Sequence, residues 1–184
     1  KIFDELFQGS LKILDCAAGT GAYAFRLAEQ GHTVTATDIT PRHIDYINEH
    51  LKDKSYHMKT AVLDATDMSM FEDESFDIIC ADLCLHYFRR DDTRFILQEL
   101  KRILTPGGHI FVRVNSVKDT LHGAGEGVEV EKHVYKMDDG TIKRFFDEDD
   151  IKEIFSGFTT LFCEEQKMYR YSSEKIAYTI CLKK

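Results

Sequence analysis

Two acidic residues that end consecutive apolar segments are the residues of this chain best placed to do chemistry. The segment 12–14 is typical of a short buried strand that ends at Asp15, and the next strand, 33–37, ends at Asp38. Between them, Ala17, Gly19 and Gly21 form a turn with little side-chain bulk, where the backbone can approach a ligand closely. A carboxylate such as Asp38 accepts two hydrogen bonds from a ribose diol. The arrangement therefore indicates a nucleotide-like ligand.

Two kinds of nucleotide ligand fit this turn. Gly19, Gly21 and Ala24 match the GxGxxG/A fingerprint of dinucleotide-binding proteins, so an NAD-dependent dehydrogenase is one alternative. Against it, Asp15 at the end of the first strand would repel a doubly charged pyrophosphate. A sulfonium ligand with a zwitterionic amino-acid tail meets no such repulsion, and the sequence favours it.

Strand and helix patterns alternate through the first two thirds of the chain, which predicts a parallel sheet with crossover helices. Glycine at position 31 is suited to end the first helix in a left-handed conformation, and Thr40 is the expected cap of the second, with Pro41 in its first turn. The Pro106-Gly107-Gly108 segment is expected to end the third helix. The predicted helices are 22–30, 42–52 and 91–104, and the further strands are 58–63, 76–81 and 109–114.

The last third of the chain departs from this alternation. Residues 115–127 are polar, and the segments 128–137 and 141–146 flank a predicted hairpin turn at Asp138-Asp139-Gly140. Asp147 is expected to cap a helix that runs to Phe155, and strands are expected at 158–165 and 175–182. The pattern predicts one domain over residues 1–184, with residues 115–146 as an insertion on the substrate side.

These motifs resemble the class I S-adenosylmethionine-dependent methyltransferases. Their first motif, (D/E)xGxGxG, is matched by Asp15, Gly19 and Gly21, with Ala17 in the place of the first glycine. Further matches are Asp64-Ala65 after the third strand, Ser75-Phe76-Asp77 before the fourth and LTPGGHIFV before the fifth. The resemblance implies a doubly wound α/β fold with a mostly parallel seven-stranded sheet, an antiparallel last strand and a hairpin inserted after strand five. It also implies S-adenosylmethionine as the cofactor.

The resemblance assigns cofactor-binding residues at successive strand ends. Asp15 would face the amino-acid end of the cofactor, Asp38 the ribose and Asp64 with Ala65 the adenine, while the segment that begins at Asp82 would pass beside the methyl group. The full expected set is Asp15, Ala17, Gly19, Gly21, Asp38, Ile39, Asp64, Ala65, Asp82 and Leu83.

Candidates for the acceptor side follow the fourth and fifth strands. His86 has the side chain to act as a general base, because its ordinary pKa lies near neutrality, and Tyr87 and Arg113 are the other catalytic candidates. Arginine binds carboxylates and oxyanions in a bidentate manner. The segments RVNSVKD and KRFFDEDDIKEIF resemble the tellurite-resistance type of small-molecule methyltransferase, which favours a small polar or anionic acceptor. The expected substrate residues are Asn115, His122, Arg144 and Arg170.

Charge and cysteine content narrow the expected partners. The formal net charge of −8 argues against nucleic-acid and anionic membrane surfaces, so we expect a small-molecule substrate and no nucleic-acid partner. Five cysteines without a CxxC pair indicate a reduced, cytoplasmic protein. Cys80, Cys84 and His86 lack the spacing of a metal site, so no metal is expected. A catalytically silent cofactor-binding module remains a second alternative, and the sequence carries no signal for an oligomeric state.

Overall fold

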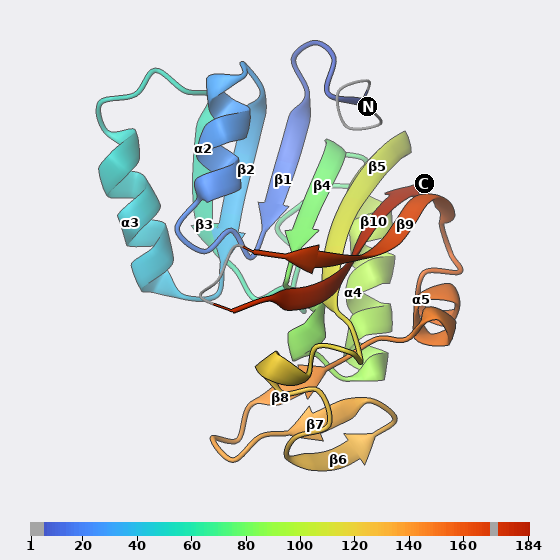
Figure 1. Cartoon of the computed structure of the whole chain (residues 1–184). Coiled ribbons are helices and arrows are strands. Elements are labelled where there is room, and N and C mark those ends of the chain that lie inside the picture. The colour runs from blue at the N-terminus through green and yellow to red at the C-terminus, as the bar shows by residue number, and fades with distance from the viewer. Residues whose placement is uncertain (1–5, 170–172) are drawn as a thin grey trace.

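The computed structural model describes residues 6–169 and 173–184, and its centre is a seven-stranded sheet (Figure 1). The strand order is β3-β2-β1-β4-β5-β10-β9, and β10 runs antiparallel to both neighbours while the first five strands are parallel. This confirms the predicted fold class. The strands are β1 (Lys12–Cys16), β2 (Thr33–Asp38), β3 (Met58–Val62), β4 (Phe76–Asp82), β5 (Leu104–Asn115), β9 (Thr159–Met168) and β10 (Lys175–Lys183).

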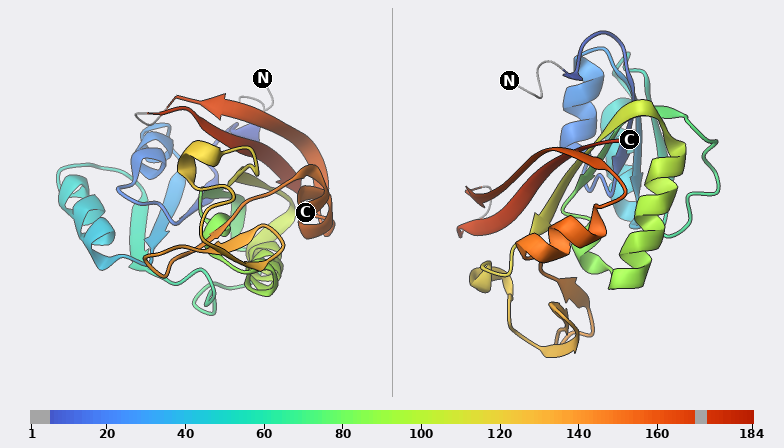
Figure 2. Two further views of the ribbon diagram at one scale, coloured as in Figure 1. Left: turned by 60° about the horizontal axis from the view of Figure 1, so that its bottom comes forward. Right: turned by 90° about the vertical axis from the view of Figure 1, so that its right-hand side faces the viewer.

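Helices cover both faces of the sheet (Figure 2). Helices α2 (Ala22–Glu29) and α3 (Pro41–Leu51) lie on one face, and α4 (Arg90–Ile103) and α5 (Glu148–Ile154) lie on the other. Successive residues of a strand point to opposite faces, so Ile13 packs with α2 and α3 while Leu14 packs with α4 and α5. Burial on both faces explains the continuous apolar runs of the central strands. Within the described part of the chain, no helix has the length and apolar character needed to cross a membrane.

The ends of the helices confirm some predicted caps and correct others. Gly31 has a φ of 91° after α2, and Asp147 accepts a hydrogen bond from the Asp150 backbone N–H at the start of α5. Thr40 is the N-cap residue of α3, as expected, but its side chain makes no capping hydrogen bond; its backbone N–H donates to Asp38 Oδ1 over 2.9 Å. The Pro106-Gly107-Gly108 segment does not end a helix either: α4 ends at Ile103, and β5 already pairs with β4 at Leu104.

The insertion after β5 forms a small sheet of its own. Its strands β6 (Val128–Glu131), β7 (Val134–Lys136) and β8 (Ile142–Arg144) pair antiparallel in that order. The predicted turn at Asp138-Asp139-Gly140 is confirmed, but the chain also turns at His133, whose φ is 59°, so three strands replace the expected two. In Figure 1 this sheet lies beyond the carboxyl ends of β4 and β5, close to the short helix η1 (Leu85–Tyr87).

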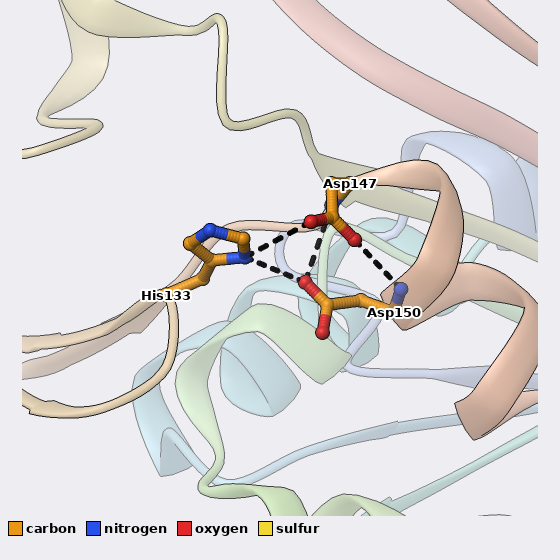
Figure 3. A group of neighbouring side chains, drawn as sticks. All are labelled: His133, Asp147 and Asp150. Atoms are coloured by element: carbon orange, nitrogen blue, oxygen red, sulfur yellow. Dashed lines mark hydrogen bonds and ion pairs between the residues drawn. The ribbon is translucent and has the colours of Figure 1, made fainter.

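A network of ion pairs connects the insertion to α5 and α4, and Figure 3 shows the part of it between His133, Asp147 and Asp150. Asp150 is only 1% exposed, and its carboxylate lies 2.7 Å from His133 Nδ1 and 3.1 Å from Arg90 Nη2. Lys132 Nζ lies 3.2 Å from the neighbouring carboxylate of Asp147. His133, Asp147 and Asp150 are close enough together to hold a metal ion, but the basic side chains of Arg90 and Lys132 already neutralise the two carboxylates. The cluster is therefore a structural ion-pair network.

Replacing Asp150 should weaken this connection. Asp150→Asn leaves the Arg90 guanidinium and the His133 ring without their buried carboxylate, and we expect the free energy of unfolding to fall by about 3 kcal/mol. Chemical denaturation measures the change. Asp149→Asn is the matched control, because Asp149 is an exposed residue on the same helix turn. Equal stability of the two variants would contradict this assignment.

Candidate functional site

A cleft of about 310 Å³ opens at the carboxyl ends of β1 and β4. The turn between β1 and α2 forms one wall, and the end of β4 forms the other. Parallel α/β sheets bind ligands at this edge, outside the carboxyl ends of their strands. The cleft is lined by Asp15, Ala17, Ala18, Gly19, Thr20, Ala22, Tyr23, His43, Asp82 and Leu83.

The turn between β1 and α2 depends on left-handed backbone conformations. Ala17, Gly19 and Gly21 have φ values of 61°, 56° and 80°. A Cβ atom added to Gly19 would have no neighbour within 4 Å, whereas one added to Gly21 would lie 2.8 Å from Ile47 Cγ1. Gly19 therefore leaves open space beside the cleft, and Gly21 allows α2 to approach α3 closely. Ala17 occupies a conformation that is rare for residues with a side chain, and such strain is typical of ligand sites.

Asp38 holds the turn to the next helix. Its Oδ2 accepts a hydrogen bond from the Gly19 N–H over 2.8 Å, and its Oδ1 accepts one from Thr40 N–H and lies 3.1 Å from His43 Nδ1. Burial alone would raise the pKa of Asp38, but these hydrogen bonds outweigh it and lower the pKa. Asp38 is therefore a buried carboxylate that shapes the glycine turn, and not a solvated acid at the end of a strand.

Asp15 is a buried acid that lines the cleft. Its side chain is 2% exposed, and its Oδ2 has no hydrogen-bond partner among the described residues. Burial, and next the negative charge of Asp82, raises the pKa of Asp15 to about 7. A buried acceptor oxygen that lines a cleft is a binding feature for a cationic or hydrogen-bond-donating group.

Arg113 is paired with Asp82, and together with Tyr23 both residues line a separate pocket beside the cleft. The guanidinium makes two hydrogen bonds to the Asp82 carboxylate, and its Nη2 also donates to Tyr23 Oη over 2.7 Å. These contacts join β5, β4 and α2 at the edge of the cleft. The arrangement gives Arg113 a positioning role for Asp82.

A second pocket, of about 200 Å³, lies between η1, the end of β5 and the insertion. We call it the acceptor-side pocket; it shares Leu83 with the cleft. Two of its lining residues each have a buried atom, His86 Nδ1 and Asn115 Oδ1, without a hydrogen-bond partner among the described residues. Burial, and then the charges of Lys175 and Lys143, lowers the pKa of His86 to about 3, so its ring is neutral. The pocket is lined by Leu83, His86, Tyr87, Asn115, His122, Lys143 and Lys175.

The remaining predicted site residues lie elsewhere. Arg144 is fully buried beside α4, where its Nη1 donates to Thr93 Oγ1 over 3.3 Å, and it lines neither pocket. Arg170 falls outside the described residues. The exposed carboxylate of Asp64 accepts hydrogen bonds from Thr66 within its own turn. Gly21, Asp38, Ile39, Asp64 and Ala65 do not line the cleft.

Several residues that line the two pockets were not predicted. Tyr23 and His43 lie on helices next to the cleft, and Lys143 and Lys175 come from strands that only the folded chain brings beside η1. Alternation along β8 offered one signal: neighbouring residues of a strand face opposite sides, so only one of Lys143 and Arg144 can line the pocket, and in the structure it is Lys143. The sequence around Lys175 carried no comparable signal.

The fold and the cleft define a Rossmann-like protein that binds a nucleotide-type ligand at the carboxyl edge of its sheet. Comparison with known families gives the class: the methyltransferase domain family matches residues 13–108. The chain belongs to this family, and S-adenosylmethionine is its cofactor. The family assignment sets aside the alternative of an NAD-dependent dehydrogenase. The orphaned Asp15 oxygen and the open space at Gly19 fit a cofactor that carries a sulfonium and an ammonium group at its amino-acid end.

Curated relatives act on different acceptors. A tRNA N(3)-methylcytidine methyltransferase of Schizosaccharomyces pombe is 25% identical over 78% of this chain and 61% of its own length. A tRNA 5-carboxymethoxyuridine methyltransferase of Escherichia coli is 29% identical over 59% of this chain and 41% of its own length. A thiol S-methyltransferase of Mus musculus is 29% identical over 56% and 42%. The chain thus spans less than two thirds of each relative.

Solved structures share the whole fold. A methyltransferase of Methanosarcina mazei superimposes with a TM-score of 0.84 at 20% identity and covers 100% of this chain and 96% of its own. TehB of Haemophilus influenzae does so with a TM-score of 0.74 at 17% identity, covering 100% and 60%.

The expectation that excluded nucleic acid as a partner is wrong. Curated relatives named as tRNA methyltransferases align with most of this chain. The exclusion rested on the net charge of −8, which averages over the whole surface. It does not describe the acceptor-side pocket, where Lys143 and Lys175 place two basic side chains.

The two glycines of the turn should respond differently to alanine. Gly19→Ala places a methyl group beside the cleft, so we expect S-adenosylhomocysteine affinity to fall at least about tenfold, with a stability loss of about 1 kcal/mol from the left-handed φ. Gly21→Ala crowds Ile47, and we expect a stability loss of about 2 kcal/mol. Calorimetric titration and denaturation measure both. Unchanged affinity in Gly19→Ala would remove that turn from the site.

The buried acid should couple stability to pH. The pKa of Asp15 is about 7 in the folded state against an ordinary value of 3.8, so between these values the folded state binds more protons and stability falls as pH rises. The Asp15→Asn variant does not lose stability in this way, because its amide does not ionise. We therefore expect the Tm of the variant minus the Tm of the wild type to increase between about pH 5 and about pH 8. Its affinity for S-adenosylhomocysteine at the higher pH should fall, because the amide carries no charge. A Tm difference that is constant with pH would contradict the assignment.

Proposed function

We propose that this chain transfers the methyl group of S-adenosylmethionine to a small acceptor that carries a polar or anionic group. In this proposal the cofactor occupies the cleft, with Asp15 and Asp82 near its amino-acid end, Gly19 beside it and Asp38 towards its ribose. The acceptor occupies the acceptor-side pocket. Residues 115–146 form the substrate-side insertion of a single domain.

The shared wall at Leu83 carries the proposal. Leu83 lines both the cleft and the acceptor-side pocket, and it has a left-handed φ of 51° at the end of β4. A group bound in one space is therefore a neighbour of a group bound in the other. The volume of about 200 Å³ suits a small molecule or a single chemical group of a larger one.

The charges of the pocket support a polar or anionic acceptor. Lys143 and Lys175 both line it, and both influence the pKa of His86 through their charges. Lys175 is paired with Asp119 at 2.9 Å, whereas Lys143 Nζ has a carbonyl contact of 3.5 Å to His122 O. Lys143 is therefore the side chain that we assign to an anionic group of the acceptor.

The residues of the chain would act mainly by positioning. Bound S-adenosylmethionine supplies a methyl group that is already activated by its sulfonium. The strained turn at Ala17 and the Asp82–Arg113 pair hold the walls of the cleft, while His86 Nδ1 and Asn115 Oδ1 offer buried hydrogen-bonding atoms to the acceptor. In-line transfer gains its rate from such alignment and from the exclusion of water.

A second candidate acceptor is a nucleotide of tRNA. The curated relatives that methylate tRNA favour it, and one of them is named for a carboxymethoxyuridine, whose carboxylate would suit the same basic pocket. In this case one base would enter the acceptor-side pocket while the remainder of the tRNA stays outside.

A pair of matched thiols tests the proposed acceptor class. We expect mercaptoacetate, which carries a carboxylate, to be methylated with a kcat/KM about tenfold above that of neutral 2-mercaptoethanol, because Lys143 would gain one charged hydrogen bond. Lys143→Met should abolish the preference. Lys136→Met is the control, since Lys136 is exposed on the adjacent strand β7.

Radiolabelled methyl transfer measures each rate. Transfer to tRNA transcripts but to neither thiol would replace the small acceptor with the second candidate. Binding of S-adenosylhomocysteine without transfer to thiols or tRNA would instead favour a catalytically silent cofactor-binding module.

A further inference from the structure

A histidine on the insertion shares the acceptor-side pocket with His86. His122 ends the short helix η2 (Thr120–His122), and its side chain is 24% exposed. Its Nδ1 lies 2.8 Å from Asp119 Oδ1, and its Nε2 lies 3.2 Å from Ser173 Oγ. The ring is therefore held at both nitrogens, and it reaches the pocket as well as solvent.

Asp119 holds the His122 ring in place through a buried carboxylate. It is 1% exposed, and its carboxylate accepts hydrogen bonds from Lys175 Nζ over 2.9 Å and from the Ile176 N–H over 3.1 Å in addition to its contact with His122. These contacts tie the insertion to β10. The negatively charged Asp119 oxygen beside Nδ1 favours the tautomer of His122 that carries its proton on Nδ1. In this tautomer Nε2 is free of a proton and can accept one.

We propose that His122 is the general base that accepts the proton of the nucleophile and that Asp119 is its positioning residue. This inference rests on the proposed function and narrows its substrate class: the acceptor carries a protonated nucleophile, such as a thiol, hydroxyl or amine, next to its anionic group. The Ser173 hydroxyl lies where a hydrogen-bond donor to Nε2 would lie. In the proposal, the protonated nucleophile of the acceptor, written X–H, takes the place of this hydroxyl.

The step balances without a further reactant. The X–H bond breaks as its proton passes to His122 Nε2, and the electron pair of X forms the new bond to the methyl carbon. The carbon–sulfur bond of the cofactor breaks, and its electron pair stays on sulfur in S-adenosylhomocysteine. His122 then releases the proton to solvent, which its partial exposure allows.

His86 is less suited to this role. Its ring is buried, and its pKa is lowered to about 3, so it would not hold a proton near neutrality. Its unpartnered Nδ1 fits the task of orienting the acceptor. The assignment of His86 as a base stays a prediction from the sequence.

Charged groups from several elements face His122 and bear on its pH dependence. Asp119 lies beside Nδ1, and Lys175 approaches from β10. Lys143 of β8 contacts the His122 carbonyl, His86 of η1 lines the same pocket, and Glu126 lies on the loop beside Gly123 and Lys143.

The pH profile of His122→Asn tests the base. With mercaptoacetate as the probe, we expect kcat near neutrality to fall at least about a hundredfold, while KM and S-adenosylhomocysteine affinity stay within about twofold. The deficit should shrink as the pH approaches the ionisation of the thiol itself, because the thiolate needs no base. His57→Asn is the control, since His57 is exposed at the far side of the sheet from this pocket.

A second measurement does not depend on a variant. Long-range proton–nitrogen NMR spectra of the wild type should show the neutral His122 ring protonated at Nδ1. A ring protonated at Nε2 would overturn the proposal, because that nitrogen then has no free electron pair for a proton.

The outcomes separate this proposal from the proposed function. If the wild type methylates mercaptoacetate and His122→Asn keeps the wild-type rate and pH profile, only the base is overturned. If the wild type transfers no methyl group to mercaptoacetate or any other small acceptor, the proposed function and the base both fail.

Discussion

Three carboxyl groups meet at one edge of the sheet, and the structure must control their mutual repulsion. Parallel pairing brings the ends of β1, β2 and β4 together, and with them Asp15, Asp38 and Asp82. Backbone N–H groups stabilise the charge of Asp38, and the Arg113 guanidinium neutralises Asp82. For Asp15, burial and the charge of Asp82 outweigh a backbone hydrogen bond from Ala24, and its pKa rises to about 7. In the proposed function, a cationic group of the cofactor would stabilise the charged form of Asp15.

The same edge concentrates backbone strain. Ala17 and Leu83 both adopt left-handed conformations, at the ends of β1 and β4, although each carries a side chain. Such conformations persist only where the surrounding packing imposes them. Here Ile13 and Leu14 anchor β1 in two separate cores, so the strand cannot relax to relieve the turn. The site therefore relies on the stability of the sheet around it.

The acceptor side is built by a different principle. The cleft comes from the ends of neighbouring strands, whereas the acceptor-side pocket is assembled by hydrogen bonds between segments distant in the chain. Asp119 joins η2 to β10, and the network around Asp150 joins the small sheet to α4 and α5. A family with one cofactor and many acceptors can vary such an insertion without disturbing the sheet.

The sequence by itself determined the order of strands and helices, the antiparallel last strand and the acids at the strand ends. The antiparallel direction of the last strand was implied by the family resemblance; the other features follow from local apolar periodicity and turn residues, which act over a few neighbouring positions. The tertiary structure alone decided the partners of the charged side chains. Arg113 is engaged by Asp82, Arg144 is buried beside Thr93, and Lys175 reaches Asp119 across 56 positions of sequence. The sequence gives the charge of a side chain, but its partner depends on which distant segments pack together. This packing of distant segments decides the chemistry of the acceptor-side pocket.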